Sequence, residues 1–228
     1  MFKKNILELV MAFMLLAGIF MLSREGAKMV ANQAEERKTV IIDAGHGAAD
    51  PGKVGVNGLK EKDVNLSIAL KLEKILKKEG MKVIMTRKDD SPLYTKGTQN
   101  KKAEDMQKRV ALINETKPDC VISIHQNSYS QESVKGAQVF YYQSSIEGKK
   151  LGEIMQSKLV EMVDPKNHRQ AKGNGTYFLL KKTEAPLAIV ECGFLSNKEE
   201  ADLLGDENYQ DKLVEAISSG IKEYLGVK

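Results

Sequence analysis

Short apolar runs with strand-like composition alternate with longer segments of helical periodicity from Lys38 to the end of the chain. In Leu59–Gly80, for example, apolar residues recur three or four positions apart, and the glycine at position 80 ends the segment. Strands that alternate with helices favour a parallel or mixed sheet with helices on both faces. At 228 residues, the chain has room for one α/β domain of this kind with a full core, or at most for two small domains.

The apolar runs and the periodic segments predict the individual elements. The expected strands are Lys38–Ala44, Met81–Arg87, Asp119–Ser128, Gly136–Tyr142, Tyr177–Lys182 and Pro186–Asn197. The expected helices are Leu59–Gly80, Met106–Lys117, Gly148–Met162 and Asn208–Leu225. Two polar stretches, Lys88–Asp105 and Val163–Thr176, are expected to be loops. We therefore expect one domain over residues 38–228.

The first 37 residues have a different character. Two lysines precede a run from Ile6 to Leu22 that is apolar except for Glu8, and the polar stretch Ser23–Lys38 follows. This order is typical of a secretory signal or an uncleaved membrane anchor. The run of about seventeen residues is at the lower limit for a membrane-spanning helix. We expect residues 1–37 to be a signal peptide or membrane anchor with a linker, and the body to be extracytoplasmic, either secreted or anchored.

Charge and cysteine content exclude some classes of protein. The net charge of +4 is a small excess of 35 basic over 31 acidic residues, and no basic run is interleaved with aromatic residues, so nucleic acid is not an expected partner. Cys120 and Cys192 both lie in apolar runs, which favours buried free thiols and leaves a bridge between them open. Their separation and the presence of only three histidines argue against a thiolate zinc site.

Three apolar strands each end in an ionisable residue, namely His46, His125 and Glu191. A buried strand tolerates a charge poorly without a partner, because desolvation costs several kcal/mol. The carboxyl ends of strands in open α/β sheets are also where ligands bind. Glu61 is a fourth candidate, fifteen residues after His46 at the start of the first expected helix. The pattern predicts that these residues form one site.

Two histidines and one carboxylate, with an open fourth position for water, are a recognised catalytic zinc set. Zinc in such a set lowers the pKa of the water to roughly 7 and polarises a substrate carbonyl. A second carboxylate is then free to take and return the proton. Glu61 and Glu191 can fill these two acidic roles.

Each of these residues also has a purely structural interpretation. Glu61 would interact favourably with the dipole of the helix that it begins. His125 could be a core histidine that is hydrogen-bonded to a neighbour on its own strand. Glu191 could pair with Arg87 or Arg169. The structural interpretations are less favoured when the residues are considered together, because the strand ends converge and the residue types match the zinc chemistry.

Four motifs follow one another along the chain, namely IDAGHG followed by DPG, then EKDVNL (Glu61–Leu66), SIHQNS (Ser123–Ser128) and ECGFLSN (Glu191–Asn197). In order and spacing they resemble the zinc-dependent N-acetylmuramoyl-L-alanine amidases of the Amidase_3 type, over roughly Lys38–Gly226. One departure is Ala48, where the family often has a second glycine after the His-Gly pair. The departure touches no ligand.

The resemblance implies a Zn²⁺ site with His46, Glu61 and His125 as ligands and Glu191 as the general base. It also implies that Asn127 and Arg169 help to hold the substrate. The third histidine of the chain, His168, matches no ligand position, and we interpret it as an exposed loop residue.

The resemblance further implies hydrolysis of the amide bond between N-acetylmuramic acid and L-alanine in peptidoglycan. The compact architecture is similar to that of sporulation-specific members, which prepare spore cortex for muramic-δ-lactam formation and hence germination, and which can depend on an activating protein partner. Two alternatives stay open. A zinc peptidase that cleaves another wall peptide bond would share the same chemical residues, and a non-enzymatic wall-binding module would be expected to have lost one of them.

Overall fold

The computed structural model describes residues 11, 13–26 and 37–227 and divides the chain into two units, Met1–Arg37 and Lys38–Lys228. In the first unit, residues 11 and 13–26 are helical and exposed. The predicted signal or anchor lies partly outside the described residues. Across the residues that are described, no helix has both the length and the apolar character needed to cross a membrane.

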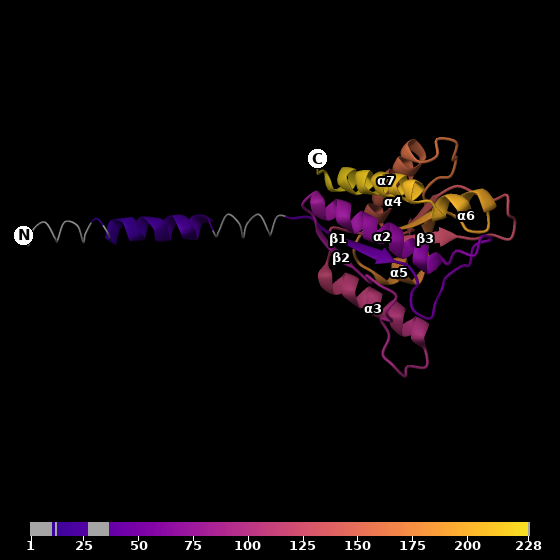
Figure 1. Cartoon of the computed structure of the whole chain (residues 1–228), viewed down its shortest axis with the longest axis horizontal. Helices are drawn as coiled ribbons and strands as arrows, with labels where there is room; N and C mark the ends of the chain where they lie inside the picture. The colour runs from indigo at the N-terminus through magenta and orange to yellow at the C-terminus, as the bar shows by residue number, and fades with distance from the viewer. Residues whose placement is uncertain (1–10, 12, 27–36, 228) are drawn as a thin grey trace, which may run out of the picture. The chain divides into compact units, whose positions relative to one another are not determined.

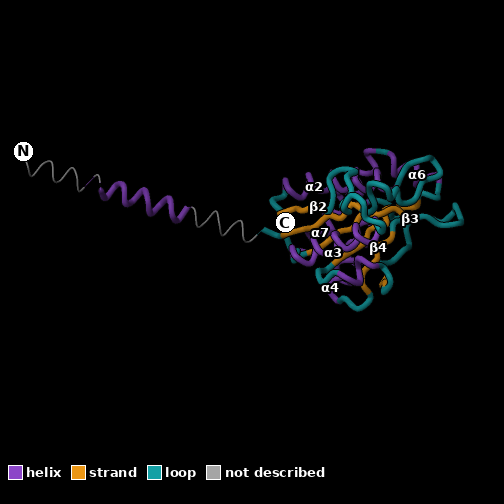
Figure 2. Tube along the Cα trace, turned by 90° about the horizontal axis from the view of Figure 1, so that it is seen from below, coloured by secondary structure: helices purple, strands orange, loops and turns teal. Residues whose placement is uncertain are grey.

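One six-stranded mixed sheet forms the centre of the second unit (Figures 1 and 2). Its strands are β1 (Thr39–Ala44), β2 (Lys82–Met85), β3 (Cys120–Asn127), β4 (Gln138–Tyr142), β5 (Lys172–Asn174) and β6 (Leu187–Phe194). The strand order is β2-β1-β3-β6-β4-β5. Neighbouring strands are parallel except for β4, which runs antiparallel to β6. The mixed sheet predicted from the sequence is therefore confirmed.

Helices cover both faces of this sheet, as Figure 1 shows for α2 and α7 on one face and α3 on the other. The helices are α2 (Glu61–Lys78), α3 (Lys101–Thr116), α4 (Ile146–Met162), α5 (Phe178–Lys182), α6 (Lys198–Gly205) and α7 (Glu207–Leu225). The larger apolar cluster lies between the sheet and α2, α4, α6 and α7. A smaller cluster lies between the sheet and α3 and α5.

Alternation along the strands assigns each side chain to one of these two clusters, because successive strand residues point to opposite faces. Along β1, Val40, Ile42 and Ala44 pack into the larger cluster, and Ile41 packs into the smaller one. All four side chains are fully buried. Near-continuous apolar runs of this kind are what a sheet covered on both faces requires.

Helix α3 begins five residues earlier than predicted, at Lys101 rather than Met106. The side chain of Asn100 caps it by accepting a hydrogen bond from the amide of Ala103 at 3.1 Å. The loop expected over Lys88–Asp105 is therefore shorter. Charged residues at the start of the helix gave the segment the composition of a loop, although an N-cap signal was present.

Three further differences lie in the second half of the chain. The expected strand Tyr177–Lys182 is instead the one-turn helix α5, a common ambiguity for short apolar runs. Strand β5 lies within the expected loop Val163–Thr176, where it pairs with β4. Helix α6 was not predicted, although Asn197 caps it through the amide of Glu200 at 3.0 Å.

Candidate metal centre

Three neighbouring strands bring the candidate residues to one edge of the sheet. His46 follows the end of β1 by two residues, His125 lies near the end of β3, and Glu191 lies in β6. Because β3 and β6 are adjacent and parallel, His125 and Glu191 are direct partners in the strand register. The register shifts immediately afterwards, between His125 and Asn127, as is common where a sheet turns side chains toward an active site.

His46, Glu61 and His125 offer one ligand atom each within 4.8 Å of one another, the arrangement expected of a metal-binding cluster. One oxygen of Glu61, Oε1, lies 3.1 Å from Nε2 of His46 and 2.9 Å from Nδ1 of His125. The two imidazole rings are nearly perpendicular, with their centroids 5.0 Å apart. Three side chains from β3, α2 and the turn after β1 thus converge on one small volume.

Two glycines make this convergence sterically possible. A Cβ atom at Gly45 would lie only 2.3 Å from the His125 ring. A Cβ atom at Gly52 would lie 2.5 Å from the Glu61 carboxylate and 2.8 Å from the His46 ring, and Gly52 has a left-handed φ of 67°. Any larger side chain at either position would displace a candidate ligand. The glycines of the IDAGHG and DPG motifs therefore serve the geometry of the site.

A second layer of hydrogen bonds orients these side chains. Asp50 lies 2.9 Å from Nδ1 of His46, which leaves Nε2 directed at the cluster. The Glu61 carboxylate accepts hydrogen bonds from the backbone amides of Lys53 at 2.8 Å and Gln126 at 3.1 Å. Metal-bound histidines and carboxylates are usually held by such outer partners.

Electrostatics favour an ionised Glu61. Its burial alone would raise its pKa, but the hydrogen bonds and charges of His125 and His46 outweigh burial and lower the pKa well below its usual range. For His46, burial would lower the pKa, yet the hydrogen bond and charge of Glu61, followed by those of Asp50, raise it. A carboxylate that stays charged beside two imidazoles fits a divalent cation.

Glu191 has a different environment from Glu61. It is 9% exposed, and within the described part of the chain its Oε2 atom has no hydrogen-bond partner. Burial raises its pKa to about 7. Neither arginine that the sequence suggested as a partner pairs with it, because Arg87 and Arg169 donate to backbone carbonyls and Gln138 instead. A carboxyl group that titrates near neutrality is suited to take and return a proton.

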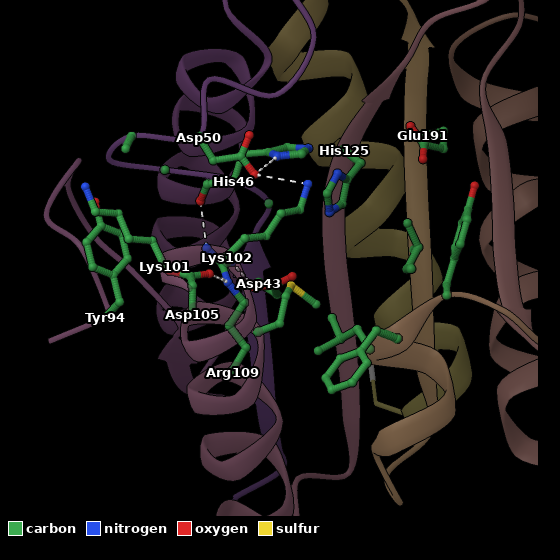
Figure 3. A pocket seen from close by; sticks show the side chains of 18 residues that line it. Asp43, His46, Asp50, Tyr94, Lys101, Lys102, Asp105, Arg109, His125 and Glu191 are labelled. Carbon is green, nitrogen blue, oxygen red and sulfur yellow. Dashed lines mark hydrogen bonds and ion pairs between the residues drawn. The ribbon is translucent and has the colours of Figure 1, made fainter. Parts of the chain in front are cut away.

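Two pockets meet at this cluster. A largely apolar pocket of about 580 Å³ extends along α3 and α5, and a more polar one of about 330 Å³ extends along the residues after β3. Figure 3 shows His46, His125 and Glu191 along one side of the larger pocket, with Arg109 below them in that view. Both pockets share the same central residues, namely His46, Asp50, Lys102, His125, Tyr177 and Glu191. A substrate can therefore extend to both sides of the centre.

The remaining sequence candidates lie in different places. Asn127 lines the polar pocket beside the centre. Arg169 lies in a separate pocket that shares no lining residue with the other two, and it stacks on Phe194 with its guanidinium carbon 4.8 Å from the ring centroid. His168 is exposed, as expected. Cys120 and Cys192 are buried free thiols, which confirms that interpretation.

Some residues around the site were not singled out from the sequence. Asp50 orients His46, and Asp43 forms a buried ion pair with Arg109 beneath the cluster. Burial would raise the pKa of Asp43, but the charge of Arg109 and hydrogen bonds from neighbouring hydroxyl groups lower it to about 2. An available signal was the placement of Asp43 inside the otherwise apolar run VIIDA, since a buried carboxylate requires a partner.

Residues 40–223 match the Amidase_3 family, described as N-acetylmuramoyl-L-alanine amidase. The germination-specific N-acetylmuramoyl-L-alanine amidase of Bacillus subtilis (strain 168) is 40% identical over 194 residues, which cover 84% of this chain and 81% of that protein. The chain therefore belongs to the Amidase_3 family, and it is an N-acetylmuramoyl-L-alanine amidase that acts on peptidoglycan.

Solved structures agree with this assignment. The CwlD amidase from Clostridioides difficile, determined in complex with the GerS lipoprotein, is 41% identical with a TM-score of 0.81, over 84% of this chain and all of that one. The catalytic domain of CwlV, an N-acetylmuramoyl-L-alanine amidase from Bacillus (Paenibacillus) polymyxa var. colistinus, is 34% identical with a TM-score of 0.71, over 84% of this chain and 99% of that one.

Proposed function

We propose that this amidase is a zinc enzyme in which His46, Glu61 and His125 hold the metal and Glu191 is the general base. The observation that carries the proposal is the convergence of three ligand atoms within 4.8 Å beside a buried carboxyl oxygen that has no partner among the described residues. Two imidazoles, one carboxylate and an open side match the donor set of catalytic zinc. The Asp50 contact to His46 supplies the outer hydrogen bond that such a site needs.

Zinc bound at this cluster would supply Lewis acidity, which lowers the pKa of a water molecule and polarises a carbonyl oxygen. Glu191 would take the proton from the attacking water and pass it to the departing amine of L-alanine. Its raised pKa of about 7 favours both transfers near neutral pH. The larger pocket and the polar pocket would hold the substrate on the two sides of the scissile amide, and Asn127 is placed to contact it in the polar one.

We further propose that the substrate is spore cortex peptidoglycan, with removal of the stem peptide preparing muramic acid for δ-lactam formation. Support comes from the similarity of about 40% to a germination-specific amidase and to CwlD. The CwlD structure contains a lipoprotein partner, and we propose that an activating protein of that kind also binds this chain. The N-terminal apolar run supports an extracytoplasmic location, with the segment acting as a signal or anchor.

A direct test uses the full chain, loaded with zinc and incubated with purified peptidoglycan. Mass spectrometry is expected to find free stem peptides that begin with L-alanine and glycan strands without peptide. A chelator should abolish both products and the Glu191→Ala variant should lower their rate of formation by orders of magnitude, whereas Glu153→Ala, at an exposed position on α4, should leave that rate unchanged. Peptides released by cleavage at another bond would identify a zinc peptidase instead.

The spore role has a separate test. Deletion of the gene in its host should yield spores whose cortex lacks muramic-δ-lactam and which germinate poorly. Cortex with normal δ-lactam content would rule out this role while leaving the amidase chemistry intact.

A further inference from the structure

Arg87, directly after β2, has an environment that is unusual for a charged side chain. It is 5% exposed, and within the described part of the chain it forms no salt bridge to a carboxylate. Its guanidinium instead donates to four backbone carbonyls. Burial lowers its pKa, and the nearby charge of Arg109 lowers it further. The charges of Asp43, Asp90 and Asp105 offset part of this effect.

The carbonyls that Arg87 contacts belong to two segments that carry candidate metal ligands. Its Nε and Nη2 atoms donate to Ala44 at 2.9 Å and to Gly45 at 3.0 Å, immediately before His46. The same Nη2 atom donates to the carbonyl of Lys62 at 2.7 Å, immediately after Glu61. One planar group thus joins the turn that carries one ligand to the first turn of the helix that carries another.

Arg109 completes the support of the same turn from α3. It donates to the carbonyl of His46 at 2.7 Å and to that of Ala44 at 2.9 Å. Three successive carbonyls, at residues 44, 45 and 46, therefore accept hydrogen bonds from guanidinium groups. His46 and the nearby Ala48 have left-handed φ angles of 61° and 50°, which non-glycine residues adopt only at a cost. The guanidinium hydrogen bonds hold the turn in this conformation.

We infer that Arg87 is a positioning residue of the metal centre, which sets the separation of His46 and Glu61 by bonding to the backbone beside each of them. A rigid fork with five donors can hold carbonyls of two segments at once, and a lysine ammonium cannot reproduce that geometry. The inference rests on the proposed function, because it takes these two residues to be metal ligands. It adds a role for a residue outside the ligand set and outside both pockets.

The test measures the Zn²⁺ affinity of the full chain by competition with a chromophoric chelator, for wild type, Arg87→Met and Arg87→Lys. Outer partners of metal ligands typically contribute about 10- to 100-fold to affinity, so Arg87→Met should weaken zinc binding by about that factor. Arg87→Lys should be weakened several-fold, and it keeps the test valid where the methionine variant folds poorly. The visible absorption of the Co²⁺-loaded lysine variant should also change, because it reports ligand geometry.

A matched control separates positioning from general stability. Gln156 on α4 is also buried, but its hydrogen bonds go to the backbone of Val139 and Ala137, at β4 and just before it, rather than to a segment that carries a candidate ligand. Gln156→Met should lower the melting temperature of the metal-free protein and leave the zinc affinity unchanged. Equal zinc affinity in wild type and both Arg87 variants would overturn the inference, and so would an equal loss of affinity in the Gln156 variant.

A His125→Ala variant distinguishes failure of the inference from failure of the proposed function. Zinc binding by wild type that is lost in His125→Ala supports the metal centre, and the Arg87 variants then decide the inference alone. A wild-type chain that binds no zinc overturns both.

Discussion

The two faces of the sheet differ most at the edge where the strands end. On the face covered by α2, α4, α6 and α7, apolar packing continues to the last residue of β1, Ala44. On the face covered by α3 and α5, Ile41 is followed two residues later by Asp43, and Ile189 is followed by Glu191. The same strands therefore supply an apolar core on one face and polar site residues on the other, and Glu61 joins the site from the start of α2.

This difference shows that core residues and site residues lie only two positions apart along the same strands. Side chains two residues apart on a strand point to the same face. On the face covered by α3 and α5, the side chain two positions after a core residue therefore belongs to the site. The short α5 and the start of α3 cover the site face only partly and leave the pocket of about 580 Å³ (Figure 3). The opposite face needs no such space and is filled by large buried side chains.

The largest expected effect is a difference in kcat between variants at two neighbouring residues of β6, Glu191 and Cys192, which point to opposite faces of the sheet. Glu191→Ala should lower kcat by about 10²- to 10⁴-fold with zinc retained, because a positioned general base contributes about that much. Cys192→Ala, at the next residue and on the packed face, should keep kcat and lose only stability. Turnover by each variant on purified peptidoglycan provides the measurement, and undiminished hydrolysis by Glu191→Ala would contradict the assigned base.

Loss of the Arg109 guanidinium beneath the site should have the next largest effect, which is on the free energy of unfolding. Arg109→Met leaves Asp43 buried without its partner, which typically costs about 3–5 kcal/mol in the free energy of unfolding. The wild-type ion pair stabilises the fold above about pH 3.8, and this contribution is lost as the pH falls toward 2, the pKa of Asp43 in the folded protein. Urea unfolding at pH 7 and pH 3 measures both effects, and the deficit of the variant should be smaller at pH 3.

Glu191→Gln should stabilise the metal-free protein while removing the base. The pKa of Glu191 is raised from 4.5 to about 7, so the folded state favours the protonated carboxyl. The cost of burying the charge is absent below pH 4.5, develops as the pH rises to 7, and is complete above it. A shift of this size corresponds to about 3 kcal/mol. Melting temperatures at pH 8 should therefore rise in the variant and should not at pH 4; equal shifts at both would contradict this origin.

The smallest effect belongs to the packed face. Ile68 on α2 is fully buried in the larger cluster, and Ile68→Val removes one methylene group. We expect a loss of about 0.5–1.5 kcal/mol in the free energy of unfolding with unchanged kcat. Denaturant titration measures the free energy of unfolding, and turnover by the same preparation measures kcat. A clear loss of kcat would show that the two faces are coupled.

The sequence was sufficient for most elements because their signals are local. The apolar stripe of α2 and the strands that end near His46, His125 and Glu191 lie where the patterns predict them. The sequence-based predictions were wrong for two short elements, β5 and α5, whose composition does not indicate the structure that they adopt. Strand β5 contains Gly173 between polar residues and exists through its pairing with β4, while α5 is an apolar run too short for its periodicity to distinguish helix from strand.

By itself, the sequence determined the α/β class and predicted one cluster of candidate residues near strand ends and at the start of a helix, since hydrophobic periodicity and buried ionisable residues are properties of short segments. Only the tertiary structure decided that the cluster closes to within 4.8 Å, that Glu191 keeps an oxygen without a partner among the described residues, and that Arg87 bonds to backbone rather than to Glu191. These features depend on sheet order and on contacts between residues far apart in the chain. No local pattern encodes which buried charge will meet which partner.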